Sequence, residues 1–421
     1  MTKKNNYKKI IFISNNLEIV DKITQNDDFI KIIYSKSKIE KYLDLNNYPN
    51  LKNIKFSCNS FKFTVNCFGL MSDYIENLDC SSGCINGEII VLPSRLKILK
   101  LNDNSMKILP KLPETLIQLE FNNSPNIILS ELPKNLVHLE FSNNNINIFE
   151  NNYLSELVNL KILKLSYNKF KKDHISSNNH VLPKNLVHLE MSSCDLDTTI
   201  FGDFLQHVGK LKYLEILKIN NNKLTNIDFI DKSNKSLTTL ECSLNEIKNL
   251  DNLPENIQVI KCIKNEILHL DNLPQKLKKL LCSYNKIKIL DNLPVGLEEL
   301  DCSYNNIMTI DYLPSSLVKL DISGNTDINN LDNLPTSLKF LTGGNSCVNK
   351  LNNLPTNLLK LKMYGRLKLD ELLNIPKNIE SIIIADKYGI LKFKSDFLPI
   401  FKIYKMNKHS YILYNYDINR L

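Results

Sequence analysis

Four cysteines recur at an interval of twenty residues, at Cys242, Cys262, Cys282 and Cys302. A series of thiols could hold a soft metal or form a redox pair, because thiolates ligate zinc and exchange disulfides. Tetrahedral zinc, however, requires four ligands that converge on one point. Thiols that recur once per repeat lie in a line and do not converge. We therefore interpret the four cysteines as buried core residues, with a disulfide between neighbours as the alternative.

Elsewhere the sequence offers few residues in patterns that support catalysis or metal binding. Cys58, Cys67, Cys80 and Cys84 are too irregularly spaced for a standard zinc module. The sequence contains no GxxxxGK[ST], GxGxxG, HExxH or GxSxG motif. We expect no cofactor and no metal.

Two histidines are each followed, two residues later, by a glutamate in the repeated stretch LPKNLVHLE. The pairs are His138 with Glu140 and His188 with Glu190. A His–Glu pair could exchange protons with a substrate. Because the whole stretch is duplicated, we interpret both pairs as solvent-exposed residues of a repeated strand. The sequence thus predicts a protein that is not an enzyme.

An internal repeat dominates the chain. Leu-Pro or Ile-Pro pairs place prolines at 254, 274, 294, 314, 335, 355 and 376, and many units read LPxxLxxLxCSxNxI. One unit contains Leu297, Leu300, Cys302, Asn305 and Ile307. Alternating apolar residues predict a strand with one buried face, and such strands bury that face only by stacking. The recurring asparagine is placed to satisfy backbone groups where the chain turns after the strand.

This pattern resembles the leucine-rich repeat, whose core reads LxxLxLxxNxL. The resemblance covers roughly residues 51–390, about sixteen units. The Leu-Pro start resembles the short repeats of bacterial effectors and of giant amoebal virus and slime mould proteins. The resemblance to the leucine-rich repeat implies an α/β solenoid with a curved parallel sheet, a mostly irregular convex side and a few short helices. Gly83, Ser124 and Cys194 depart from the pattern at the asparagine position, and TGGNSC, residues 342–347, is out of phase by about one residue.

The sequence predicts three parts: residues 1–50 as an N-terminal cap or small non-repeat element, 51–390 as the repeats, and 391–421 as a C-terminal cap. In the first part, KIIFIS predicts a strand and residues 15–29 a helix. The stretches NNYLSELVNL and FGDFLQHVGKLKYL predict short helices on the convex side. Alternatively, the protein is an adaptor that recruits host ubiquitin-ligase or signalling machinery through residues 1–50.

Composition sets broad limits on the setting of the 421-residue chain. Basic residues exceed acidic ones by eight, and no apolar run approaches the ~20 residues that span a bilayer. The N-terminal stretch IIFIS is too short for the core of a signal peptide, and the ten cysteines lack the clustering of secreted modules. We expect a cytoplasmic protein, in the host cell if it is viral, that does not bind membranes.

The solvent-facing strand positions indicate where a partner would bind. The position after the second leucine holds basic residues in some repeats and acidic residues in others, from Lys100 and Glu120 to Asp301 and Asp321. This mixture of charges disfavours the binding of nucleic acid. Exposed tyrosines among charged residues are typical of a protein interface. We predict a monomeric scaffold that binds a protein partner on its concave face. The candidate binding residues are Lys261, Lys264, Lys279, Leu281, Tyr284, Glu299, Asp301 and Tyr304.

Overall fold

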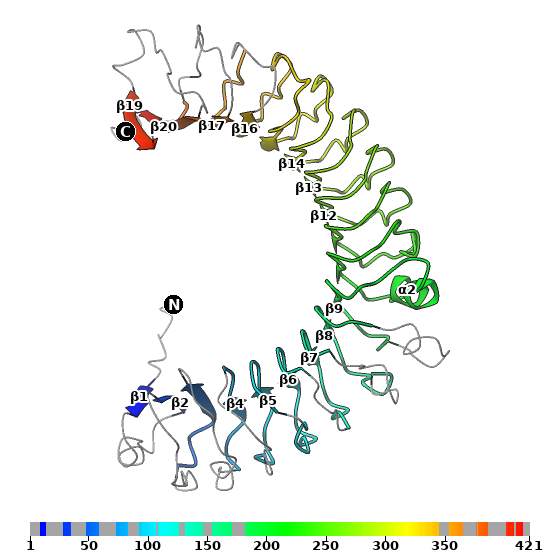
Figure 1. Cartoon of the computed structure of the whole chain (residues 1–421), viewed down its shortest axis with the longest axis vertical. Helices are drawn as coiled ribbons and strands as arrows, with labels where there is room; N and C mark the ends of the chain where they lie inside the picture. The colour runs from blue at the N-terminus through cyan, green and yellow to red at the C-terminus, as the bar shows by residue number, and fades with distance from the viewer. Residues whose placement is uncertain are drawn as a thin grey trace. The chain divides into compact units, whose positions relative to one another are not determined.

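The computed structural model describes residues 9–13, 28–34, 48–58, 73–82, 92–106, 108–125, 131–145, 154–170, 182–344, 353–364, 376, 378–385, 401–407 and 410–415. The chain divides into two compact units. The first comprises residues 1–196 and 203–214, and the second comprises residues 197–202 and 215–421. Each unit is a stack of short strands joined by longer connecting segments, as the ribbon in Figure 1 shows.

In the first unit, each strand pairs in parallel with the next strand along the chain. The strands are β1 (Lys9–Ile13), β2 (Phe29–Tyr34), β3 (Asn53–Cys58), β4 (Asn77–Asp79), β5 (Ile98–Lys100), β6 (Gln118–Glu120), β7 (His138–Glu140), β8 (Ile162–Lys164) and β9 (His188–Glu190). The predicted strand in KIIFIS is confirmed as β1. Of the predicted helix at 15–29, residues 15–27 lie outside the described part, and Phe29 begins β2.

In the second unit, parallel pairing runs from β10 to β18. The last strand, β20, pairs antiparallel with both β18 and β19. The strands are β10 (Ile216–Lys218), β11 (Thr239–Glu241), β12 (Val259–Lys261), β13 (Lys279–Leu281), β14 (Glu299–Asp301), β15 (Lys319–Asp321), β16 (Phe340–Gly344), β17 (Lys360–Tyr364), β18 (Ser381–Ala385), β19 (Phe401–Asn407) and β20 (Ser410–Asn415).

The repeat pattern explains the burial of each unit. In β14 the middle residue, Leu300, is fully buried, while Glu299 and Asp301 on either side of it are half-buried on the opposite face. Leu297 closes a turn by donating its N–H to the carbonyl of Pro294 at 3.0 Å. Proline suits this turn because its φ is fixed and its missing N–H is not needed there. We call the side formed by the first and third strand residues the strand face; it corresponds to the predicted concave face.

The recurring asparagine satisfies backbone groups inside the stack, as predicted. The Asn305 amide donates to the carbonyls of Cys282 and Cys302 at 3.0 Å, and its side-chain oxygen accepts the N–H of Ile287 at 3.0 Å. Asn305 thus joins its own repeat to the preceding one, and the same link is made by Asn245, Asn265, Asn285 and Asn325. At one departure from the pattern, the Cys194 thiol replaces the amide and donates to the carbonyl of Leu165 at 3.3 Å.

One of the two helices predicted on the convex side is confirmed. The helix α2 (Gly202–Gly209) lies within FGDFLQHVGKLKYL and buries Phe204, Leu205 and Val208. The prediction for NNYLSELVNL is not supported where it is described, because residues 154–156 form a turn; residues 151–153 lie outside the described part. Among the described helices, none has the length and apolarity needed to cross a membrane.

The ends of the stack differ from its middle. The parallel strands β1 and β2 lie within residues 1–50, so the stack extends into the segment predicted to carry no repeat. At the other end, the antiparallel hairpin of β19 and β20 covers the edge of β18. The domain boundaries at residues 50 and 390 stay predictions, as does the proposal that residues 1–50 form an adaptor.

Candidate functional site

The strand face carries columns of in-register side chains. In the first unit, the third strand residues Asp79, Lys100, Glu120, Glu140 and Lys164 are successive neighbours. In the second unit the corresponding column is Lys218, Glu241, Lys261, Leu281, Asp301, Asp321 and Thr342. The positively and negatively charged side chains noted in the sequence therefore lie on neighbouring strands, which are ~4.8 Å apart.

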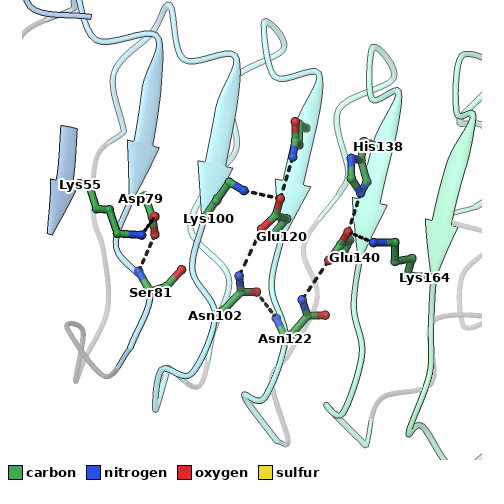
Figure 2. A network of polar contacts seen from close by, with 11 residues as sticks. Lys55, Asp79, Ser81, Lys100, Asn102, Glu120, Asn122, His138, Glu140 and Lys164 are labelled. Carbon is green, nitrogen blue, oxygen red and sulfur yellow. Dashed lines mark hydrogen bonds and ion pairs between the residues drawn. The ribbon is translucent and has the colours of Figure 1, made fainter. Parts of the chain in front are cut away.

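In the first unit, opposite charges in this column pair with one another across the strands (Figure 2). Lys100 bonds Glu120 at 2.7 Å, and Lys55 bonds Asp79 at 2.5 Å. Asn102 lies below them and bridges repeats by accepting the N–H of Asn122 at 2.8 Å. Because these charges satisfy each other, this part of the strand face is a stabilising polar network.

The two His–Glu pairs lie on the strand face, but the prediction that they are exposed is wrong. His138 and Glu140 are half-buried, with Nε2 and Oε1 2.7 Å apart, and Lys164 bonds the same carboxylate at 2.5 Å (Figure 2). In the second pair, His188 and Glu190 are 3.8 Å apart. Lys164 from the neighbouring strand lies against the first pair, a packing effect that repeat spacing does not reveal.

The Glu140 carboxylate has the most perturbed acidity in this network. The hydrogen bond from His138 and the Lys164 ammonium lower its pKa from 4.5 to about 2, against the opposing effect of burial. A carboxylate whose pKa is lower in the folded state stabilises the fold above its unfolded pKa. That contribution is lost as the pH falls through the folded pKa.

We expect Glu140→Gln to lower the free energy of unfolding by about 1–2 kcal/mol at pH 7, because it removes a partly solvated charge-assisted contact. The difference from the unmodified protein should shrink between about pH 4.5 and about pH 2. Urea unfolding across that range measures it. Glu114→Gln is the control, since it makes the same change of charge at an exposed side chain. A difference that stays constant down to pH 2 would contradict this assignment.

The cysteine series lies in the core, as predicted. Cys242, Cys262, Cys282 and Cys302 are fully buried free thiols. Burial raises the pKa of Cys242 to about 12 and raises the pKa of the other three well above 9.0. Because the thiolate is the metal ligand and the nucleophile, these groups fill space rather than react. In the described part of the chain, no three His, Cys, Asp or Glu side chains are grouped as a metal site requires; Cys67 and Cys84 lie outside it.

Two tyrosines in the second unit form a stacked pair at the end of the strand face. The ring centroids of Tyr284 and Tyr304 are 4.3 Å apart, and the rings are nearly parallel, with an 8° angle between their planes. The two residues are 52% and 44% exposed. A Cβ built on Gly324 would lie 2.7 Å from the Tyr304 ring, so that ring rests directly on the backbone of the next repeat. The pair is therefore a fixed aromatic surface open to solvent.

The backbone under these tyrosines has an unusual conformation. Tyr284 and Tyr304 have φ angles of 55° and 53°, in the left-handed region that asparagine, aspartate and glycine tolerate best. The equivalent position holds Asp103, Asn123, Asn143, Asn221 and Gly324 in some repeats, and Tyr167, Ser193, Leu244 and Lys264 in others. A bulky side chain there costs of order 1 kcal/mol or more. The two tyrosines thus occupy positions where smaller residues would stabilise the fold better.

The structure brings most of the predicted binding residues together. Lys279 bonds Glu299 at 2.7 Å. Leu281 and Asp301, two residues further along the same two strands, are also in-register neighbours. Lys261 bonds Glu241 at 2.9 Å. Lys264 is exposed and occupies, one repeat earlier, the position equivalent to Tyr284, with the same left-handed backbone conformation.

Sequence reasoning missed three contributors to this surface: Lys319, Asp321 and Gly324. Lys319 bonds Glu299 at 2.7 Å, and Asp321 is the register neighbour of Asp301. The run of Asp301 and Asp321 along one column was the signal in the sequence. The role of Gly324 depends on the backbone beneath Tyr304 and had no such signal.

Comparison with known proteins shows the fold. No protein-family model matches the chain, and no curated protein matches it by sequence. The solved structures that it resembles include CroV588, a circular leucine-rich-repeat protein, at 20% identity and a TM-score of 0.63. That match covers 89% of this chain and 62% of that one. This chain therefore spans less than two thirds of CroV588.

Two further structures are similar. YopM, a leucine-rich effector protein from Yersinia pestis, matches at 22% identity and a TM-score of 0.54, over 80% of this chain and 83% of that one. TLR13, solved in complex with the single-stranded RNA ssRNA13, matches at 18% identity and a TM-score of 0.51, over 89% of this chain and 60% of TLR13. With its stacked parallel strands and repeated asparagines, the chain has the leucine-rich-repeat solenoid fold.

Proposed function

We propose that this chain is a non-enzymatic scaffold that binds a protein partner on the strand face of its second unit, around Tyr284 and Tyr304. The observation that carries the proposal is the exposed pair of stacked tyrosine rings. Tyrosine is enriched among the residues that dominate binding energy at protein interfaces.

The surroundings of the pair support the same function. The ion pairs of Glu299 with Lys279 and Lys319 lie on the strands that lead to the tyrosines, with Glu299 five residues before Tyr304. Such polar pairs are typical of the rim of an interface. The rings are held by each other and by the backbone at Gly324. Such a preformed surface loses little conformational freedom when a partner binds.

The test is recovery of protein partners from an extract of the cell in which the protein occurs, by quantitative mass spectrometry. We expect Tyr284→Ala combined with Tyr304→Ala to weaken capture of a partner at least about 30-fold, since anchor residues of this kind contribute ~2 kcal/mol or more. The control is Tyr312→Ala, because Tyr312 is exposed but lies in a connecting segment. Undiminished capture by the double variant, checked to be folded, would refute the proposal.

A further inference from the structure

The carboxylates of Asp301 and Asp321 form an acidic pair on the strand face of the second unit. They are the third residues of β14 and β15 and lie directly opposite each other in register. Burial, together with the like charge of Asp301, raises the pKa of Asp321. Like charges directly opposite each other on neighbouring strands destabilise a sheet. The fold by itself gives no reason for this pair.

The basic side chains around the pair are engaged elsewhere. Lys279 and Lys319 both bond Glu299, each at 2.7 Å. Within the described residues, neither Asp301 nor Asp321 forms an ion pair. Asp301 accepts the Ser303 hydroxyl at 2.7 Å, and Asp321 accepts the Ser323 N–H at 3.0 Å. These donors are neutral, and the Lys319 ammonium, whose charge opposes the rise in the pKa of Asp321, forms its ion pair with Glu299.

The acidic pair adjoins the tyrosine stack. Asp301 precedes Tyr304 by three residues in the same repeat, and its charge contributes, after burial and Tyr304, to raising the pKa of Tyr284. One face of the Tyr304 ring lies against Tyr284 and the ring also rests on Gly324. An incoming group therefore meets carboxylate oxygens and aromatic edges together.

We infer that the partner bound by this surface presents an arginine side chain to Asp301 and Asp321 beside the tyrosine stack. The inference rests on the proposed function. A guanidinium group is planar and pairs with carboxylates through two parallel hydrogen bonds. Lysine offers the charge but not the planar geometry. Phosphate groups of a nucleic acid would be repelled by the two carboxylates, which favour a basic peptide segment instead.

The test is selection of a phage-displayed random dodecapeptide library on the full-length protein. It is repeated on Asp301→Asn combined with Asp321→Asn, and on Tyr284→Ala combined with Tyr304→Ala. The matched control is Asp271→Asn combined with Asp291→Asn, which makes the same change in charge at exposed aspartates in the connecting segments of neighbouring repeats. The peptide most enriched on the unmodified protein is then synthesised for affinity measurement, together with its Arg→Lys and Arg→Gln versions.

We expect arginine to be enriched in the peptides selected on the unmodified protein and on the control, and not on the Asp301/Asp321 variant. The synthesised peptide should bind that variant at least about tenfold more weakly, and its Arg→Lys version should bind the unmodified protein more weakly. Peptides that require the tyrosines but show no arginine enrichment, or that bind the Asp301/Asp321 variant equally well, would overturn this inference and leave the proposed function standing. Peptides that are indifferent to the tyrosines would overturn both.

Discussion

Asn305→Ala should lower the free energy of unfolding by about 3–5 kcal/mol, because four buried backbone groups lose a hydrogen-bond partner. The Asn305 side chain is only 8% exposed. Its amide donates to the carbonyls of Cys282, Cys302 and Ser303, and its oxygen accepts the N–H of Ile287. Alanine would leave all four backbone groups buried without these partners, and each such group costs about 1–3 kcal/mol when water cannot replace the bond.

The effect should extend beyond one repeat, because Asn305 joins two of them. Stability in a solenoid is approximately a sum of repeat and nearest-neighbour contributions, so loss of this link should lower the urea midpoint of the second unit. Asn306→Ala is the control: Asn306 is the next residue and its side chain is exposed. Equal, small changes for the two variants would contradict the structural role assigned to the recurring asparagine.

Gly324→Ala should both destabilise the protein and disrupt the tyrosine stack. The φ of Gly324 is 74°, which an alanine adopts only at a cost of about 1 kcal/mol. The added Cβ would also lie 2.7–3.0 Å from three atoms of the Tyr304 ring, so the ring must move away from its position on the backbone. We expect a total loss of about 2 kcal/mol in urea unfolding.

The same substitution should weaken partner binding although Gly324 has no side chain to contact a partner. Gly296→Ala is the matched control, since its Cβ would meet only the Lys278 ammonium group at 3.5 Å. That variant should be unchanged or slightly more stable, because alanine restricts the unfolded chain. If Gly324→Ala bound the peptide selected above as tightly as Gly296→Ala does, the position of the Tyr304 ring would have no part in binding.

Repetition explains why the fold could be predicted from the sequence. Leu300, Asn305 and their equivalents recur at fixed steps, so one physical role assigned to a position holds for every repeat. The cysteines were predictable for the same reason, since Cys302 occupies a slot that Leu101 and Leu165 fill elsewhere.

The site was predictable only in part. Exposure of Tyr284 and Tyr304 followed from their position before the recurring asparagine. Their stacking, however, depends on rotamers and on the missing side chain at Gly324. The burial of His138 depends on the packing of long side chains from adjacent strands against it. The spacing of residues in the sequence does not encode such packing.

The most direct test of the account is photo-crosslinking from the proposed surface. Benzoylphenylalanine would be placed at position 284, at position 304 or, as the control, at position 312, where the native tyrosine is 69% exposed in a connecting segment. After irradiation in an extract of the cell in which the protein occurs, we expect the same polypeptide to be captured from positions 284 and 304 and not from position 312. Capture from position 312 alone, or equal capture from all three positions, would show that partners do not bind at the tyrosine stack.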